Sequence, residues 1–83
     1  MKNLYQVLKK PIITEKSMAQ ALLGKYTFEV EKRASKGEVK QAVEKLFNVT
    51  VLGVRTAHAH EGFKKAVVTL KEGDKIELFE VGG

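Results

Sequence analysis

The sequence predicts an α+β fold, in which an antiparallel sheet of about four strands has helices packed on it, in the order strand, helix, strand, helix, hairpin. Three stretches indicate this class. Residues 39–47 carry apolar side chains at the three- and four-residue spacing of a helix, whereas residues 26–30 and 66–70 carry them at every second position, as half-buried strands do. One short chain therefore contains both periods.

Length and composition limit the protein to one small globular domain, residues 1–83. The chain is 43% hydrophobic and 30% charged, which is typical of folded rather than disordered proteins. It has no cysteine, so neither disulfides nor thiolate–zinc clusters can stabilise it, and an intracellular setting is favoured. Its apolar runs are too short for a membrane span, and residues 3–10 contain no signal-peptide core.

The first elements are expected to be short. Asn3 can cap a helical turn that runs through Leu8. Pro11 has no amide hydrogen and restrains Lys10 to extended geometry, so the chain is expected to open there into a short edge strand. A helix should follow the cap residue Thr14, with Glu15 in its first turn, an apolar face of Met18, Ala21 and Leu22, and a left-handed stop at Gly24.

The clearest element is the next helix. Ser35 and Glu38 have the spacing of a capping box, and Asn48 is a suitable left-handed stop. The apolar stripe between them is predicted to face the sheet and to build a core that lets the chain fold alone as a monomer. That core is expected to contain Tyr26, Phe28, Val30, Val39, Val43, Leu46, Val51, Val68 and Leu70.

The strand after this helix changes register. Val49 and Val51 lie on one parity and Val54 and Thr56 on the other, which predicts a β-bulge at residues 52–53. Residues 61–62 can turn a hairpin into the return strand, and residues 76–78 are a candidate final strand.

Charge is unevenly distributed along the chain, whose formal net charge is +5. Residues 1–70 hold thirteen Lys or Arg against six acids, whereas residues 71–83 hold two against four. A basic body with an acidic end favours a polyanion partner, although many solvated surfaces of soluble proteins reach the same balance.

The side chains needed for catalysis are scarce. The chain has no Cys, one Asp and two His, so it lacks the paired groups that acid–base or nucleophilic chemistry needs, and it has no glycine-rich phosphate loop. His58 and His60 would point the same way on a strand and could meet one metal beside Glu61, or they are ordinary turn residues. The second interpretation is simpler, so we expect no enzyme activity, cofactor or metal.

Four blocks occur in an order that resembles the bacterial large-subunit ribosomal protein L23 family, and together they cover most of the chain. They are residues 11–16 (PIITEK), 25–30 (KYTFEV), 42–49 (AVEKLFNV) and 64–79 (KKAVVTLKEGDKIELF). The resemblance implies a cytoplasmic, structural constituent of the large ribosomal subunit, which binds rRNA near the peptide exit tunnel. It also implies neighbouring ribosomal proteins and ribosome-associated chaperone and targeting factors as partners.

The resemblance also implies two sets of site residues. The regions that contact rRNA in the family correspond here to Lys9, Lys10, Lys32, Arg33, Lys36, Arg55, Thr56, Phe63, Lys64 and Lys65. The protein-docking contacts correspond to Glu15, Phe47 and Asn48. Phe63 could stack on an unpaired base or pack within the hairpin, while Glu15 and Phe47 could equally be a first-turn residue and a core residue.

One part of the family pattern is missing. Its long basic hairpin loop should lie between Thr56 and Lys64, where this chain has seven residues without Lys or Arg. Either the short loop is natural, or a flexible loop has been excised to give a compact domain. The alternative function is therefore a compact scaffold or protein-docking module with little RNA binding.

Overall fold

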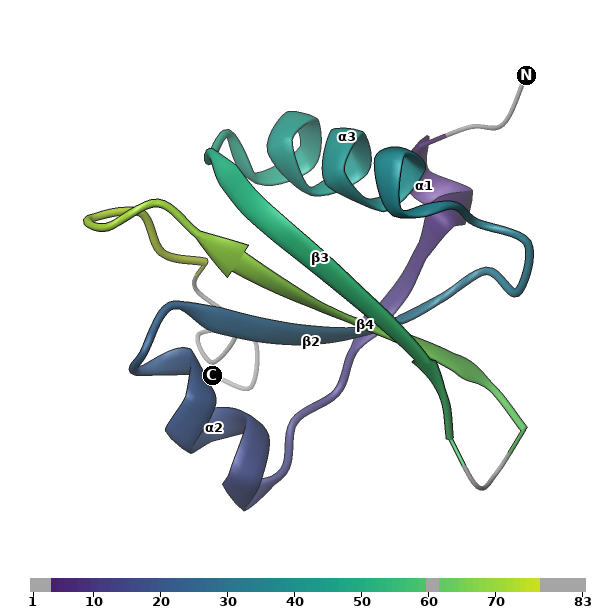
Figure 1. The fold of residues 1–83 in the computed structure, drawn as a ribbon, viewed down its shortest axis with the longest axis horizontal. Coiled ribbons are helices and arrows are strands. Elements are labelled where there is room, and N and C mark those ends of the chain that lie inside the picture. The colour runs from purple at the N-terminus through teal and green to yellow at the C-terminus, as the bar shows by residue number, and fades with distance from the viewer. Residues whose placement is uncertain (1–3, 60–61, 77–83) are drawn as a thin grey trace.

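The computed structural model describes residues 4–59 and 62–76, which form an α+β fold with an antiparallel sheet (Figure 1). The predicted fold class is confirmed. The elements, in chain order, are α1 (Leu4–Val7), β1 (Leu8–Pro11), α2 (Glu15–Ala21), β2 (Lys25–Val30), α3 (Lys36–Phe47), β3 (Val51–His58) and β4 (Lys64–Leu70).

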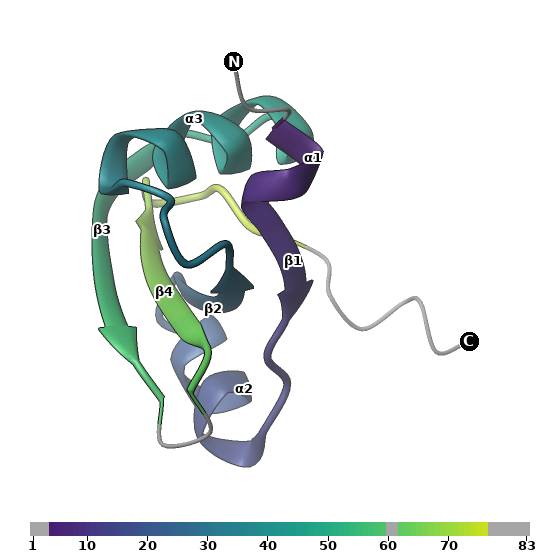
Figure 2. The same ribbon diagram turned by 90° about the vertical axis from the view of Figure 1, so that its right-hand side faces the viewer.

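The four strands pair in the spatial order β1-β2-β4-β3, with every neighbouring pair antiparallel. Strands β1 and β3 therefore form the two edges. The views in Figures 1 and 2 place α3 and α1 on one side of the strands and α2 on the other. The sheet is thus the middle layer of three. Thr27 points away from the α3 side and is buried, because α2 packs on β2 there.

The core lies between α3 and the sheet. The helix buries Val39, Ala42 and Val43, and the ring of Phe47 lies 5.7 Å from that of Phe28 on β2. Eight of the nine predicted core residues are buried, and Leu46 is half-buried against them. Five further residues are buried in the core but were not among the nine predicted: Val7 on α1, Ala34 in the loop after β2, Ala42 on α3, Ala66 on β4 and Ile76 in the segment after β4.

The predicted caps of α3 are confirmed. The Ser35 hydroxyl accepts a hydrogen bond from the Glu38 amide (3.1 Å), and the Glu38 carboxylate accepts one from the Ser35 amide (2.9 Å). Asn48 ends the helix in the left-handed region with φ 56°. The two signals fix where α3 begins and ends, and hence where its first residue, Lys36, lies.

The N-terminal prediction was wrong in its boundaries. The first helix ends at Val7 rather than Leu8, because the Val7 carbonyl accepts a hydrogen bond from the Glu31 amide (2.9 Å) and the chain then enters the sheet. The edge strand was predicted to begin at Pro11, but it begins at Leu8 and ends at Pro11. Pro11 cannot donate, and pairing resumes when the Ile12 amide bonds the Thr27 carbonyl (2.9 Å). Asn3 lies outside the described residues.

The apolar face predicted for α2 is not buried, although Thr14 caps the helix as expected. The side chain of Met18 is 45% exposed and that of Leu22 is 89% exposed; only Ala21 packs against the core. The helix ends at Ala21, which leaves Leu22 beyond its last turn. It stops early because Gly24 takes a φ of 80° and its carbonyl pairs with the Leu70 amide (2.9 Å).

The predicted bulge is confirmed, since pairing between β3 and β4 shifts between Val51 and Gly53. The start of β3 is held by two carboxylates that the sequence analysis did not single out. Glu44 accepts a hydrogen bond from the Val51 amide (2.9 Å), and Asp74 accepts one from the Thr50 amide (2.8 Å). Of the candidate strand at 76–78, Ile76 is buried but not in a strand, and residues 77 and 78 lie outside the described part.

No helix in the described ranges, 4–59 and 62–76, combines the length and the apolar character needed to cross a membrane.

Val43 is fully buried at the centre of the α3 stripe, so we expect Val43→Asp to lower the free energy of unfolding by at least about 3 kcal/mol through an unpaired buried charge. The matched control is Gln41→Asp on the exposed side of the same helix, which should cost less than about 1 kcal/mol. Urea titration of both variants measures the difference. Equal midpoints for Val43→Asp and the parent would mean that α3 does not pack on the sheet through this stripe.

Candidate nucleic-acid interface

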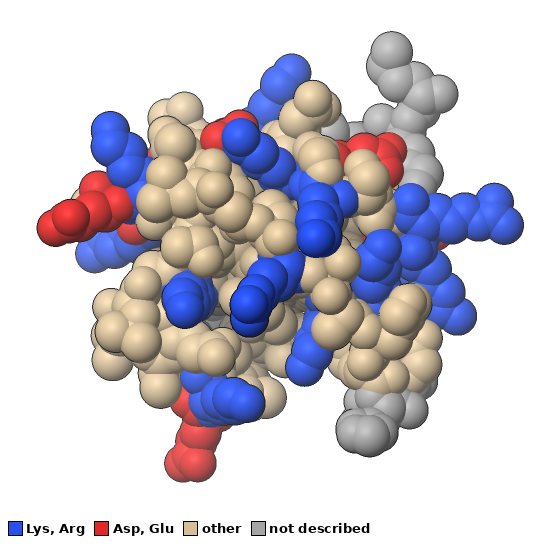
Figure 3. All heavy atoms as spheres, in the orientation of Figure 1, with Lys and Arg blue, Asp and Glu red and all other residues tan. Residues whose placement is uncertain are grey.

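The register of the sheet brings four elements together at the end where the hairpin turns. Leu8, Val30, Lys64 and His58 form one row across β1, β2, β4 and β3. The loop of residues 31–35 leaves β2 at this row, and α3 starts directly after it. Predicted RNA-binding residues that are distant in sequence therefore share one end of the molecule. Figure 3 shows Lys and Arg spread across the face on which β3 is the nearest strand, with acids mainly toward the outline.

A shallow hollow of about 470 Å³ lies at this end, and three of the predicted cations border it. Arg55 on β3 and Lys65 on β4 alternate with core residues and point to the face opposite α3. Lys36, the first residue of α3, reaches the same hollow around the edge strand. The remaining lining is Thr56, Ala57 and Val67. Three cations around a small apolar floor can neutralise phosphates of a polyanion.

The cations of β1 lie elsewhere. Strands β2 and β4 separate β1 from β3, so Lys9 and Lys10 do not border the hollow. The ammonium of Lys10 lies 3.8 Å from the carboxylate of Glu29, which sits between Lys10 and Lys65 in the same row. The Lys10 side chain is exposed while that of Glu29 is largely covered, and the pair lowers the positive charge available at the β1 edge.

The loop between β2 and α3 carries Lys32 and Arg33, both exposed. The Arg33 amide donates to the Glu31 carboxylate (2.8 Å), which shapes the turn. Lys64 differs from both. Its half-buried ammonium donates to the Ala34 carbonyl (2.7 Å) and, at 3.4 Å, to the Lys32 carbonyl. One predicted RNA-binding lysine therefore has bonding partners within the protein.

Three residues at or near the hairpin turn were considered for RNA or metal binding: His58, His60 and Phe63. Phe63 is half-buried, and its carbonyl accepts a hydrogen bond from the Ala59 amide (2.8 Å) just outside the turn. Both roles considered for its ring, stacking on a base and packing in the hairpin, fit this position. His58 is exposed, and His60 lies outside the described residues. Among the residues that the structure describes, no three His, Asp or Glu side chains gather as a metal site would require.

The predicted docking residues do not form one surface. Glu15 begins α2 on one side of the sheet, whereas Phe47 and Asn48 end α3 on the other. Phe47 is 37% exposed and packs on Phe28, so part of it belongs to the core. Glu15 is exposed and is flanked by two exposed apolar residues, Ile13 and Met18.

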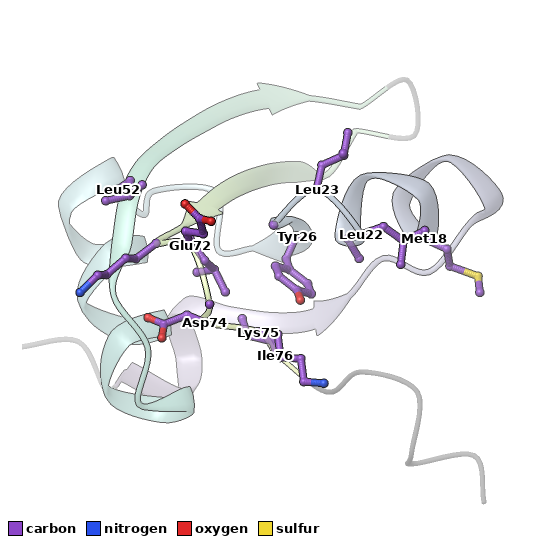
Figure 4. Close-up of a pocket in the computed structure, with 14 residues that line it drawn as sticks. Met18, Leu22, Leu23, Tyr26, Leu52, Glu72, Asp74, Lys75 and Ile76 are labelled. Carbon is purple, nitrogen blue, oxygen red and sulfur yellow. The ribbon is translucent and has the colours of Figure 1, made fainter.

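An apolar groove of about 870 Å³ lies where α2 ends, β2 begins and the segment after β4 passes (Figure 4). The sequence analysis missed it. The available signal was Leu23, a large apolar residue that lies off the predicted helix face and next to the turn glycine. The labelled side chains that line the groove include Met18, Leu22, Leu23, Tyr26, Leu52 and Ile76. Four charged residues from the segment after β4 also line it: Lys71, Glu72, Asp74 and Lys75.

These features define a class of protein. The described residues form a small, basic α+β domain with cations gathered at one end of a sheet. That combination is typical of compact nucleic-acid-binding proteins.

Comparison with known proteins identifies the family. The family model described as ribosomal protein L23 matches residues 6–62. The large ribosomal subunit protein uL23 of Heliobacterium modesticaldum is 53% identical, with 96% of this chain and 98% of the relative covered. The protein of the same name from Anaeromyxobacter dehalogenans is 52% identical over 89% of this chain and 91% of the relative. The chain therefore belongs to the ribosomal protein L23 family.

The alignments also show that this chain is shorter than its relatives within the aligned region. The Heliobacterium alignment spans 93 positions, more than the whole 83-residue chain, so the relative has residues inside the aligned region that this chain lacks. The same holds for the protein from Dehalococcoides mccartyi, 48% identical over 91 positions that include 94% of this chain. Within the aligned region, this chain is thus shorter than both proteins.

Proposed function

We propose that this protein binds large-subunit rRNA through the hairpin end of its sheet, near the peptide exit tunnel. The observation that carries the proposal is the convergence of Lys36, Arg55 and Lys65 on one hollow, with Lys32 and Arg33 in the adjoining loop. Membership of the ribosomal protein L23 family supports it. In that family the chain is a structural constituent of the large ribosomal subunit in the cytoplasm, and it is not an enzyme.

The expected mode of binding is electrostatic. Lysine and arginine side chains that neutralise phosphates release condensed counterions, so affinity falls as the salt concentration rises. The slope of log affinity against log salt concentration is proportional to the number of phosphates contacted. Only two arginines are present, so bidentate phosphate recognition is limited and lysine point charges dominate. The surface should therefore position RNA with little direct reading of base sequence.

The cations of the hollow can be tested by neutral substitution. The double variant Arg55→Gln, Lys65→Gln should reduce the slope of log affinity against log salt by about 0.7–0.9 for each lost phosphate contact, measured on one rRNA fragment. The matched control is Lys45→Gln, an exposed lysine on the far turn of α3 that does not line the hollow. If the control and the double variant lose the same affinity and slope, binding is not localised at the hollow.

The short hairpin is the second part of the proposal. We expect that a longer, Arg- and Lys-rich loop placed between Thr56 and Lys64 will raise affinity for the folded rRNA site and steepen the salt dependence. The melting temperature should change little, because the cost of closing a loop grows slowly with its length. Fluorescence titrations of both proteins across a salt series measure this.

Equal affinity and slope for the short and grafted loops would show that the hairpin tip is not where this protein meets RNA. Failure of both proteins to bind rRNA at any salt concentration would favour the rival function, a compact scaffold or protein-docking module.

A second surface supports protein docking. Glu15 is exposed, and so are two large apolar residues close to it in the sequence, Ile13 (48%) and Met18 (45%); exposed apolar patches rimmed by polar residues mark protein interaction sites. We propose that ribosome-associated chaperone and targeting factors dock here. Phe47 and Asn48 would have to serve a separate contact, because α3 lies on the other side of the sheet.

Reconstituted large subunits test this surface. Glu15→Lys or Met18→Ser should weaken chaperone binding by about tenfold, a loss of about 1.4 kcal/mol. Binding of rRNA should stay unchanged, because neither residue borders the basic hollow. Gln6→Lys on α1 is the control for added charge at another exposed site. Chaperone affinity that is unchanged in both test variants would contradict the assignment.

A further inference from the structure

Lys64 and Lys65 are adjacent on β4, yet the structure gives them different surroundings. Lys65 borders the basic hollow on one face of the sheet. Lys64 points to the opposite face, because successive residues of a strand alternate. There its ammonium donates to the Ala34 carbonyl at 2.7 Å and lies 3.4 Å from the Lys32 carbonyl.

The two carbonyls belong to the loop that connects β2 to α3. Ala34 is buried, and its own amide bonds the Glu31 carbonyl (3.0 Å), so the loop is anchored on both sides of that residue. Ser35, the next residue, is the cap of α3. A hydrogen bond to the Ala34 carbonyl therefore fixes the chain immediately before the helix begins.

The chemistry of lysine suits this position. Its long apolar stem can lie along the sheet while the ammonium, which has three donors, reaches two carbonyl oxygens. The positive charge lies close to the start of α3, where the helix dipole opposes a cation. The hydrogen bonds must offset that repulsion, and the charge adds to the positive potential around Lys36.

We propose that Lys64 is a positioning residue, whose ammonium joins β4 to the loop that carries Lys32 and Arg33 and so holds Lys36, at the start of α3, beside the hollow. Lys64 is not a phosphate ligand. This inference rests on the proposed RNA binding for its functional part, but the bond to the loop can be tested without RNA.

The first experiment uses the unmodified protein. In a ¹⁵N-labelled sample, the Lys64 ammonium should exchange its hydrogens with water more slowly than the Lys65 ammonium, because two carbonyls hold it. The slow exchange should persist when an rRNA fragment is added. The proposal would be overturned if the two ammonium groups exchanged their hydrogens at the same rate. It would also be overturned if the Lys64 ammonium left the two carbonyls and bound RNA instead. This measurement remains decisive even if a Lys64 variant fails to fold.

The second experiment compares Lys64→Met with Lys65→Met, which remove the same charge from neighbouring positions. Lys64→Met should shift the amide signals of residues 32–36 and weaken RNA binding through the displaced loop. Lys65→Met should leave those signals in place and lower the slope by about 0.7–0.9. Lys64→Arg, which keeps donors at this position, should recover part of the lost affinity.

The outcomes separate the two claims. If Lys64→Met keeps the loop signals and lowers the salt slope as Lys65→Met does, Lys64 is a phosphate ligand and the positioning role is wrong. If the unmodified protein binds no RNA, the proposed function fails, while the ammonium exchange and the loop signals still decide whether Lys64 holds the loop.

Discussion

The structure depends on the packing of α3 against one face of the sheet. The chain has no cysteine to cross-link it, so apolar contact between Val39, Ala42 and Val43 and the strands is the main stabilising interaction. Phe28 lies in the middle of that contact, against Phe47. Because the capping box and Asn48 fix the ends of α3, this packing also places Lys36 at the hairpin end of the sheet.

The antiparallel register adds a second constraint, since side chains two residues apart share a face. On β4, the period of two places the Lys64 side chain on the α3 side of the sheet and the Lys65 side chain on the opposite face. Neighbouring lysines of the same motif thereby acquire different roles, one within the protein and one in the hollow. If the register shifted by one residue, Lys64 and Lys65 would swap faces of the sheet, and the buried residues of β4 would become exposed.

Local signals in the sequence were sufficient for the capped helix, the bulge at residues 52–53, the left-handed Asn48 and most of the core. Interactions between distant segments were not predictable in the same way. The bond from the Lys64 ammonium to Ala34 and the bond from the Thr50 amide to Asp74 join residues 30 and 24 positions apart. The exposed face of α2 was missed because helical spacing indicates a shared face but not what covers it. The resemblance to the L23 family located the cations, and the fold showed which of them meet.

We propose that RNA contacts the hairpin end of the sheet, on the side of the basic hollow. The most direct measurement is an amide chemical-shift titration of the ¹⁵N-labelled protein with a large-subunit rRNA fragment at low salt. We expect the largest changes at residues 32–36, 55–57 and 65–67, with α2 unaffected and the changes reversed by added salt. Changes confined to α2 and the apolar groove, or no changes at any salt concentration, would contradict this proposal.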